Sequence, residues 1–409
     1  MLQADISSQG KSARGQVSIA AHVGFVLTGA VTTLLGPVLP ALTARWSLTD
    51  SQAGYLFTAQ FVGAVIGSVS LGAIISRCGF LRSLALGFLL MSAGVAGLAA
   101  GAWPLGLTSV FLYGMGFGIT IPATNLLISE INPGRRAAAL NIVNFAWCVG
   151  AVASPPIIAL FVNRHNLNAA LLGLALLSSA IAVWVTRCHV DVGVYKQSGD
   201  GVELRSGVWS NPFALLVAAL LFLYVGTENA IGGWVALYAA RFKDGGELLW
   251  AMGPSIFWAA LMTGRAGAPF VLRRVSEGKI VLGALVIAAI GVSFLLAASG
   301  MATLLVGVAL AGAGLACVYP TTWAVFSEYF GARASQKAGI ISAMGGLGGA
   351  TLPWAVGVAS TQFGSLRSGL LIPLLSSLVM IALQVFIMLT LSRRDAIAGS
   401  KTAEAALHS

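Results

Sequence analysis

Long apolar stretches with few charges recur along the whole chain, and short polar segments separate them. Each stretch exceeds the roughly 18–20 apolar residues that a helix needs to cross a bilayer. Several are longer, so we expect those helices to tilt or to protrude. The pattern predicts an all-α membrane protein with twelve transmembrane helices, at approximately 17–43, 51–75, 81–101, 104–129, 136–163, 167–187, 211–240, 247–272, 278–300, 302–329, 335–362 and 366–392.

The longest polar segment lies between the sixth and seventh predicted spans, from Arg187 to Asn211, and mixes both charge signs with Gly and Ser. Such composition is typical of a linker. We therefore predict two six-helix bundles, 17–187 and 211–392, joined by a linker at 188–210 and flanked by polar tails at 1–16 and 393–409.

The two predicted bundles repeat each other at an offset of 198 residues. The segment GMGFGITIPATNLLISEINPGRR, which begins at Gly114, aligns without a gap with GAGLACVYPTTWAVFSEYFGARA, which begins at Gly312. Further on, Gly150 aligns with Gly348 and Pro155 with Pro353. An even number of spans separates the copies, so both cross the membrane in the same direction. Parallel repeats with a site between them at the midplane are a plan of secondary transporters.

Composition and charge agree with a membrane protein. Hydrophobic residues make up 57% of the chain and charged residues only 9%, with a mean hydropathy of +0.90. Of the 23 basic residues, 17 fall on the side of the predicted termini and five in the opposite loops. This bias predicts an inner (plasma) membrane protein with both termini in the cytoplasm. The net charge of +10 then indicates attraction to lipid headgroups and no binding of nucleic acid.

Motifs for enzymatic chemistry are missing from the sequence. The four cysteines and four histidines are scattered, and none has the spacing of metal ligands. No phosphate-binding loop and no H-E-x-x-H motif occurs. We therefore expect neither an enzyme nor a cofactor, and an ion gradient or a solute gradient as the source of energy.

The chain resembles the major facilitator superfamily over its whole length. The loop after the second span, GAIISRCGFLR, keeps Gly72, Arg77, Gly79 and Arg82 of that family's G-x-x-x-D-R-x-G-R-R signature, with Ser76 in place of the aspartate. The segments GFGITIPATNLLISE, ALNIVNFAWCVGAVASPP and YVGTENAIGGWVALYA are similar to the fucose–proton symporter and sodium-dependent glucose transporter branch. The resemblance implies alternating access and a sugar as solute, moved with H⁺ or Na⁺.

Glu228 is the main candidate for the site, because it lies halfway along the seventh span. A carboxylate at this depth costs roughly 2.5–3.5 kcal/mol unless it meets water or a partner. Its repeat equivalent is Ala30, so symmetry does not explain it. We predict that it contacts the solute or carries the coupling ion, and the alternative is a buried structural role. Polar and aromatic residues in apolar context complete the candidate site: Asn229, Tyr224, Trp234, Gln60, Asn125, Asn144, Trp147, Tyr319 and Trp323.

Two further acidic residues, Glu130 and Glu328, are repeat partners at span ends, each five residues before an arginine. We predict that they form gating charge pairs with Arg135, Arg333 and Arg77 when the cytoplasmic side is closed.

Amides and flat aromatic faces suit a small neutral polar solute, most simply a sugar. The expected partners are this solute, H⁺ or Na⁺ and membrane lipids, and the protein is expected to be a monomer. Two alternatives remain open: an exporter of drugs or amphipathic metabolites on the same scaffold, and a non-transporting membrane sensor.

Overall fold

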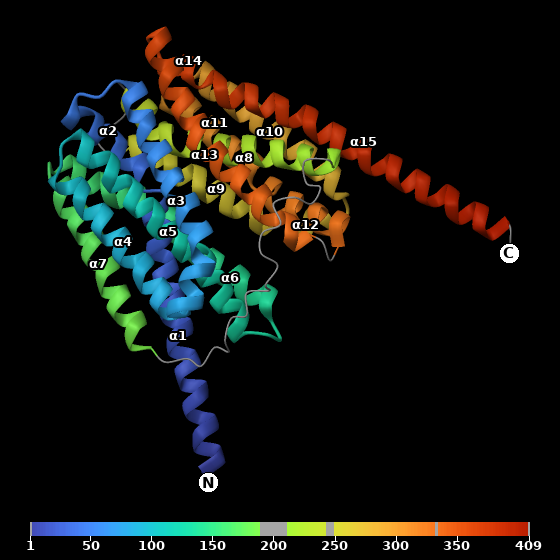
Figure 1. The fold of residues 1–409 in the computed structure, drawn as a ribbon. Helices are drawn as coiled ribbons and strands as arrows, with labels where there is room; N and C mark the ends of the chain where they lie inside the picture. Colours follow the sequence, from blue (N-terminus) through green and yellow to red (C-terminus); the bar gives the residue numbers. More distant parts are fainter. Residues whose placement is uncertain (1, 189–210, 243–248, 332–333, 408–409) are drawn as a thin grey trace.

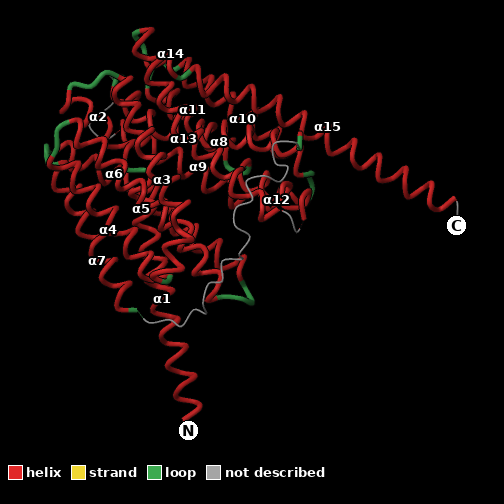
Figure 2. The backbone as a smooth tube through the Cα atoms, viewed as in Figure 1, coloured by secondary structure: helices red, strands yellow, loops and turns green. Residues whose placement is uncertain are grey.

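The structure, a computed structural model, describes residues 2–188, 211–242, 249–331 and 334–407. Helices joined by short loops make up this part of the chain, and no strand occurs in it (Figure 2). Twelve helical segments are long and apolar enough to cross a membrane, which confirms the predicted class and number of spans. The helices are α1 (Leu2–Thr32), α2 (Leu35–Trp46), α3 (Asp50–Cys78), α4 (Phe80–Ala100), α5 (Trp103–Ile131), α6 (Arg136–Asn163), α7 (Leu167–Arg187), α8 (Pro212–Ala240), α9 (Leu249–Leu272), α10 (Glu277–Ala297), α11 (Met301–Leu315), α12 (Val318–Phe330), α13 (Ala334–Phe363), α14 (Leu366–Gly369) and α15 (Leu371–Leu407).

Pairs of helices pack closely at glycines, and these glycines occupy equivalent repeat positions in the two halves. A Cβ atom at Gly150 would lie 1.8 Å from the carbonyl oxygen of Val26, where α6 crosses α1. A Cβ atom at Gly348 would lie 1.8 Å from the carbonyl oxygen of Phe222, where α13 crosses α8. Small residues allow such backbone contact between membrane helices, where packing must replace the hydrophobic effect. The aligned glycines of the repeat therefore mark equivalent crossings.

Three predicted spans are each divided into two helices, which corrects the expectation of one continuous helix; the twelfth is interrupted only at Leu370, between α14 and α15. The first span breaks at Thr33 and Leu34, ahead of Pro37 in the first turn of α2. The tenth span breaks at Ala316 and Cys317, where Pro320 follows in the first turn of α12. Proline has no backbone N–H, so a helix that reaches it loses one hydrogen bond.

The ends of the chain are more regular than predicted, since α1 already begins at Leu2 and α15 continues to Leu407. The tails predicted at 1–16 and 393–409 are thus helical where the structure describes them. The predicted linker lies outside the described residues, apart from Cys188.

Helices α1–α7 form one half and α8–α15 the other, and the halves meet mainly through α3 against α13, α6 against α9, and α2 against α8. We call the end of each half that leads to the chain termini the terminal side, and the end with the turns at 47–49, 164–166 and 298–300 the opposite side. In Figure 1 the halves lie together near α2 and α14 and point apart toward α12 and the first turns of α1. The two halves therefore converge on the opposite side.

Candidate functional site

Glu228 has a charged partner inside the protein. Its carboxylate lies 3.4 Å from Nη2 of Arg265, which projects from α9. The same nitrogen donates to the Tyr224 hydroxyl at 3.2 Å, one turn before Glu228 on α8. Glu228 is 9% exposed and Tyr224 is fully buried. Because a buried carboxylate is costly alone, the half-buried guanidinium of Arg265 explains how Glu228 stays inside a membrane-spanning helix.

Arg265 is fixed by a second contact on another helix. Its Nε donates to the carbonyl oxygen of Ala316, at 3.3 Å. In a regular helix that oxygen would accept from residue 320, but Pro320 has no N–H to offer. The guanidinium therefore connects the break between α11 and α12 to the carboxylate on α8.

Three aromatic side chains lie in a row next to this pair. The rings of Tyr224 and Tyr319 lie 5.7 Å apart, and those of Tyr319 and Trp323 lie 6.1 Å apart in an edge-to-face arrangement. Tyr319 is close enough to interact electrostatically with both Glu228 and Arg265. The prediction that Tyr224, Tyr319 and Trp323 gather near Glu228 agrees with this geometry.

The first half of the molecule contributes α6 to the same region. Cys148 on α6 is close enough to interact electrostatically with Arg265 and Glu228. Trp147, beside it, packs edge-to-face on Trp258 of α9 at 5.6 Å. Neither indole N–H has a hydrogen-bond partner among the described residues, although both nitrogens are buried. The charged pair therefore lies next to the boundary between the halves, beside two buried indole N–H groups.

The three asparagines predicted for the site differ in their hydrogen bonds: two bond to each other and one bonds to its own helix. Asn144 donates to the Oδ1 atom of Asn125 at 3.2 Å and to the Leu140 carbonyl at 2.8 Å, and its side chain is exposed. Asn229 is half-buried and donates to the Val225 carbonyl of its own helix at 2.8 Å. Asn125 and Asn144 thus form a pair between α5 and α6, and Asn229 keeps its amide oxygen free of bonds to the described residues.

Two other predicted site residues make hydrogen bonds within the protein. Gln60 is 2% exposed, donates to the Thr32 carbonyl and accepts from the Tyr113 hydroxyl, both at 3.0 Å, so it joins α3 to α1 and α5. Trp234 is fully buried and donates to the Pro353 carbonyl at 2.9 Å. Its ring packs on Phe57 from the other half, at 5.6 Å. Their predicted contact with solute stays a prediction.

A polar cluster holds the halves together on the opposite side. Asp50, at the start of α3, accepts from Arg241 at 2.5 Å and from the Ser360 hydroxyl. The backbone N–H of Ser51 donates to the Thr361 hydroxyl at 2.8 Å. Every one of these bonds links the first half to the second. Sequence reasoning missed this cluster, because an aspartate at a helix start also fits a simple interaction with the helix dipole.

The predicted gating residues lie at the terminal side. Glu130, Arg135, Glu328 and Arg77 are all exposed. The ion pairs in the described part of the chain are Asp50–Arg241 and Glu228–Arg265, so Glu130 and Arg135 are not paired there. Arg333 lies outside the described residues. The gating pairs, which were predicted for a closed terminal side, stay a prediction.

Arg265 is the principal residue near Glu228 that sequence reasoning did not include in the candidate site. It is a basic residue within a predicted span, and an intramembrane charge is by default a functional candidate with a partner to be found. Its position in the span next to that of Glu228 marked it as a candidate partner, although the contact itself depends on how α8 packs on α9.

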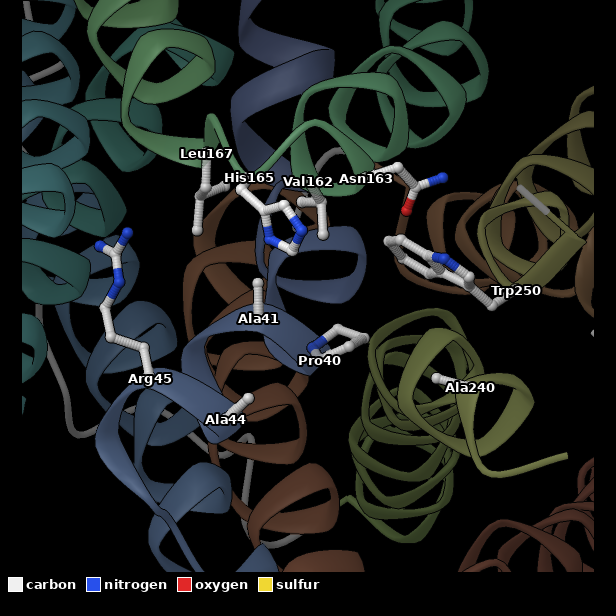
Figure 3. Close-up of a pocket in the computed structure, with 10 residues that line it drawn as sticks. All are labelled: Pro40, Ala41, Ala44, Arg45, Val162, Asn163, His165, Leu167, Ala240 and Trp250. Atoms are coloured by element: carbon white, nitrogen blue, oxygen red, sulfur yellow. The ribbon is translucent and has the colours of Figure 1, made fainter. Parts of the chain in front are cut away.

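A cavity of about 560 Å³ lies on the opposite side, between α2, the turn after α6, α8 and α9. Figure 3 shows Arg45, His165 and Trp250 around it. Neither Glu228 nor Arg265 lines it. It therefore lies at the outer edge of the contact between the halves and is separate from the charged pair.

Two pseudo-equivalent six-helix halves, with a charged pair beside the boundary between them, define a membrane transport protein. The sequence model of the Major Facilitator Superfamily matches residues 21–336, and the chain belongs to this family. Within the described residues no group of His, Cys, Asp or Glu side chains could hold a metal ion.

Relatives and solved structures agree with this class. A candidate metabolite transport protein of Haemophilus influenzae is 30% identical over 192 residues, which are 46% of this chain and 46% of that protein. The chain thus spans about half the length of this relative. A candidate glucose/galactose transporter of Helicobacter pylori is 24% identical over 85% of this chain and 89% of its own. The crystal structure of a mutant of the nucleoside transporter NupG has the same fold, with a TM-score of 0.76 at 14% identity over 92% of this chain and 99% of that one.

Proposed function

We propose that the chain is a secondary active transporter that moves a small neutral polar solute, a sugar, together with H⁺. The observation that carries this proposal is the Glu228–Arg265 pair beside the boundary between the halves, flanked by tyrosine and tryptophan side chains. Discontinuous helices and midplane sites between repeats are typical of secondary transporters. The break between α11 and α12 lies at this pair.

The chemistry of the surroundings favours a sugar. The charges of Glu228 and Arg265 cancel, so the region offers no net charge to a strongly charged solute. The indole N–H groups of Trp147 and Trp258 have no partner among the described residues and could donate to hydroxyl groups. The faces of Tyr319 and Trp323 could pack on the C–H faces of a sugar ring. The similarity to a candidate glucose/galactose transporter supports the same solute class.

Alternating access gives the pair its role. In this structure the halves are bonded together on the opposite side through Asp50, so solute would enter or leave from the terminal side. With both termini in the cytoplasm of an inner-membrane protein, as the basic residues favour, this is the state open to the cytoplasm. The other state requires the Asp50 contacts to break.

Coupling to H⁺ follows from the charge of Glu228. Protonation removes that charge, so the attraction to Arg265 and Tyr224 weakens and the guanidinium is free to donate to the solute. Deprotonation restores the pair and displaces the solute from the guanidinium. Within the described residues Glu228 belongs to no group of His, Cys, Asp or Glu side chains that could hold a metal ion, which favours H⁺ over Na⁺ as the coupling ion.

The test is transport by the purified protein in liposomes. Radiolabelled glucose, galactose, fucose and xylose are offered in counterflow, and then with an imposed pH gradient or Na⁺ gradient. We expect counterflow of at least one sugar, and accumulation of that sugar driven by the pH gradient. Accumulation driven by Na⁺ alone would replace H⁺ as the ion, and no counterflow of any sugar would overturn the solute class.

A further inference from the structure

Two membrane-spanning segments that are repeat partners carry a proline at the same position. Pro122 in α5 and Pro320 in α12 are 198 residues apart. Each lacks the N–H that would bond to the carbonyl oxygen four residues earlier. The carbonyls deprived of this bond are those of Gly118 and Ala316, which are themselves repeat partners.

Each of these carbonyls receives a hydrogen bond from the equivalent neighbouring helix of its own half. The Ser68 hydroxyl of α3 donates to Gly118 at 2.9 Å. The Arg265 Nε of α9 donates to Ala316 at 3.3 Å. The repeat aligns Arg265 with Gly67, the neighbour of Ser68. The same structural need is met by a neutral hydroxyl in one half and by a guanidinium in the other.

In the second half the donor, Arg265, has further N–H groups that the bond to Ala316 does not use. A serine hydroxyl has one proton to donate, whereas a guanidinium has five N–H groups in a fixed plane. The bond from Nε to the Ala316 carbonyl fixes the orientation of the guanidinium plane. In this orientation Nη2 contacts both Tyr224 and Glu228. A close approach of the backbones permits this, since a Cβ atom at Gly264 would lie 2.5 Å from that of Ala316.

We propose that Pro320 is a positioning residue for the Glu228–Arg265 pair. Because residue 320 has no N–H, the Ala316 carbonyl is left as a free acceptor, and its bond from Arg265 orients the guanidinium toward Glu228. This rests on the proposed function for its consequence in transport, but the positioning itself does not depend on transport. The charged and titratable groups that face Glu228 are Arg265 of α9, Tyr224 of α8, Tyr319 of α12 and Cys148 of α6. Pro320 reaches this set only through Arg265.

The first test is a thermodynamic cycle on the purified protein in detergent, read as the midpoint of thermal unfolding, and needs no solute. Arg265→Met should lower the midpoint of the wild type, since it leaves both the Ala316 carbonyl and the Glu228 carboxylate without their donor. In Pro320→Ala the new N–H at residue 320 can bond to that carbonyl, so the further loss caused by Arg265→Met should be clearly smaller. Equal losses in the two backgrounds would overturn the proposal.

The first half supplies a matched control for this cycle. Ser68→Ala and Pro122→Ala should show the same kind of coupling, because Ser68 and Arg265 cap equivalent carbonyls. Suppose that the loss caused by Arg265→Met is the same with and without Pro320→Ala, whereas the loss caused by Ser68→Ala does depend on Pro122→Ala. Pro320 would then only bend the helix and would not position Arg265.

The second test separates positioning from general stability by the pH profile of proton-driven uptake. Pro320→Ala should move the pH of half-maximal uptake upward, on the order of one unit, because Glu228 loses a well-placed positive charge. Arg265→Lys keeps the charge but has no planar fork, so it should give a similar shift, and the two changes together should add little. Pro122→Ala should leave the profile unchanged. An unmoved profile in Pro320→Ala, or an equal shift in Pro122→Ala, would contradict the proposal, whereas no uptake by the wild type would count against the proposed function only.

Discussion

Replacing Asp50 with alanine should open the opposite side of the molecule. Asp50 makes two bonds across the halves, one to Arg241 and one from Ser360, and both must break when this side opens. The side chain of Arg241 is 43% exposed, so solvent screening limits the ion pair to about 1 kcal/mol or less. The Asp50 side chain is 12% exposed, and a hydrogen bond to a charged group contributes about 1.5 kcal/mol.

The sum of roughly 2 kcal/mol corresponds to a shift on the order of 30-fold toward the open state. Arg241→Ala removes the ion pair alone, so it should shift the same equilibrium only about fivefold or less. The double variant should shift it no further than Asp50→Ala, because the lost bonds all end on Asp50.

The assay is a distance distribution between spin labels on the opposite side, at Ala102 in the first half and Ser299 in the second. Both positions are exposed and lie in turns between helices. The labels require a background in which the four native cysteines, Cys78, Cys148, Cys188 and Cys317, are replaced. Asp50→Ala should add a longer-distance population that the wild type lacks. A distribution identical to that of the wild type would refute the assignment of Asp50 as a closing contact.

Three other predictions concern topology, gating and packing. Reporter fusions at Gly10 and Ser409 should both report a cytoplasmic location, and two external readings would overturn the orientation. Glu130→Gln and Glu328→Gln should weaken closure of the terminal side and leave sugar binding intact. Spin-label distances across the terminal side measure the closure, and equilibrium binding measures the affinity for sugar. Loss of binding without a change in distance would place these residues in the site. Gln60→Leu should lower the free energy of unfolding by about 1–2 kcal/mol in thermal denaturation, since the Thr32 carbonyl and the buried Tyr113 hydroxyl lose their bonds, while the KM for sugar stays the same. A raised KM in a stable protein would show that Gln60 contacts the solute.

The spans could be predicted because their signal is length and apolarity, which do not depend on tertiary contacts. The repeat was also readable, since the equivalent glycines Gly150 and Gly348 mark equivalent helix crossings. The breaks at Thr33 and Ala316 were not predicted, because hydropathy continues across them and a proline in a membrane helix need not break it.

The candidate site was predicted in part, and the reason lies in side-chain direction. Glu228 and Tyr224 share a helix face, so their proximity followed from spacing. Gln60 and Trp234 donate to carbonyl oxygens of neighbouring helices, which the sequence could not give, because the partner of an amide or an indole depends on the helix it faces. The Glu228–Arg265 pair depends on how α8 packs on α9, which spacing along one helix cannot give.

The central claim is that Glu228 couples solute movement to H⁺, and transport by Glu228→Gln in liposomes tests it most directly. Glutamine mimics the protonated carboxyl, so this variant should still exchange labelled sugar between the two sides while it loses accumulation against a gradient when a pH difference is imposed. Accumulation at the wild-type level in Glu228→Gln, and likewise in Glu228→Ala, would contradict the account and leave the carboxylate as a structural partner of Arg265.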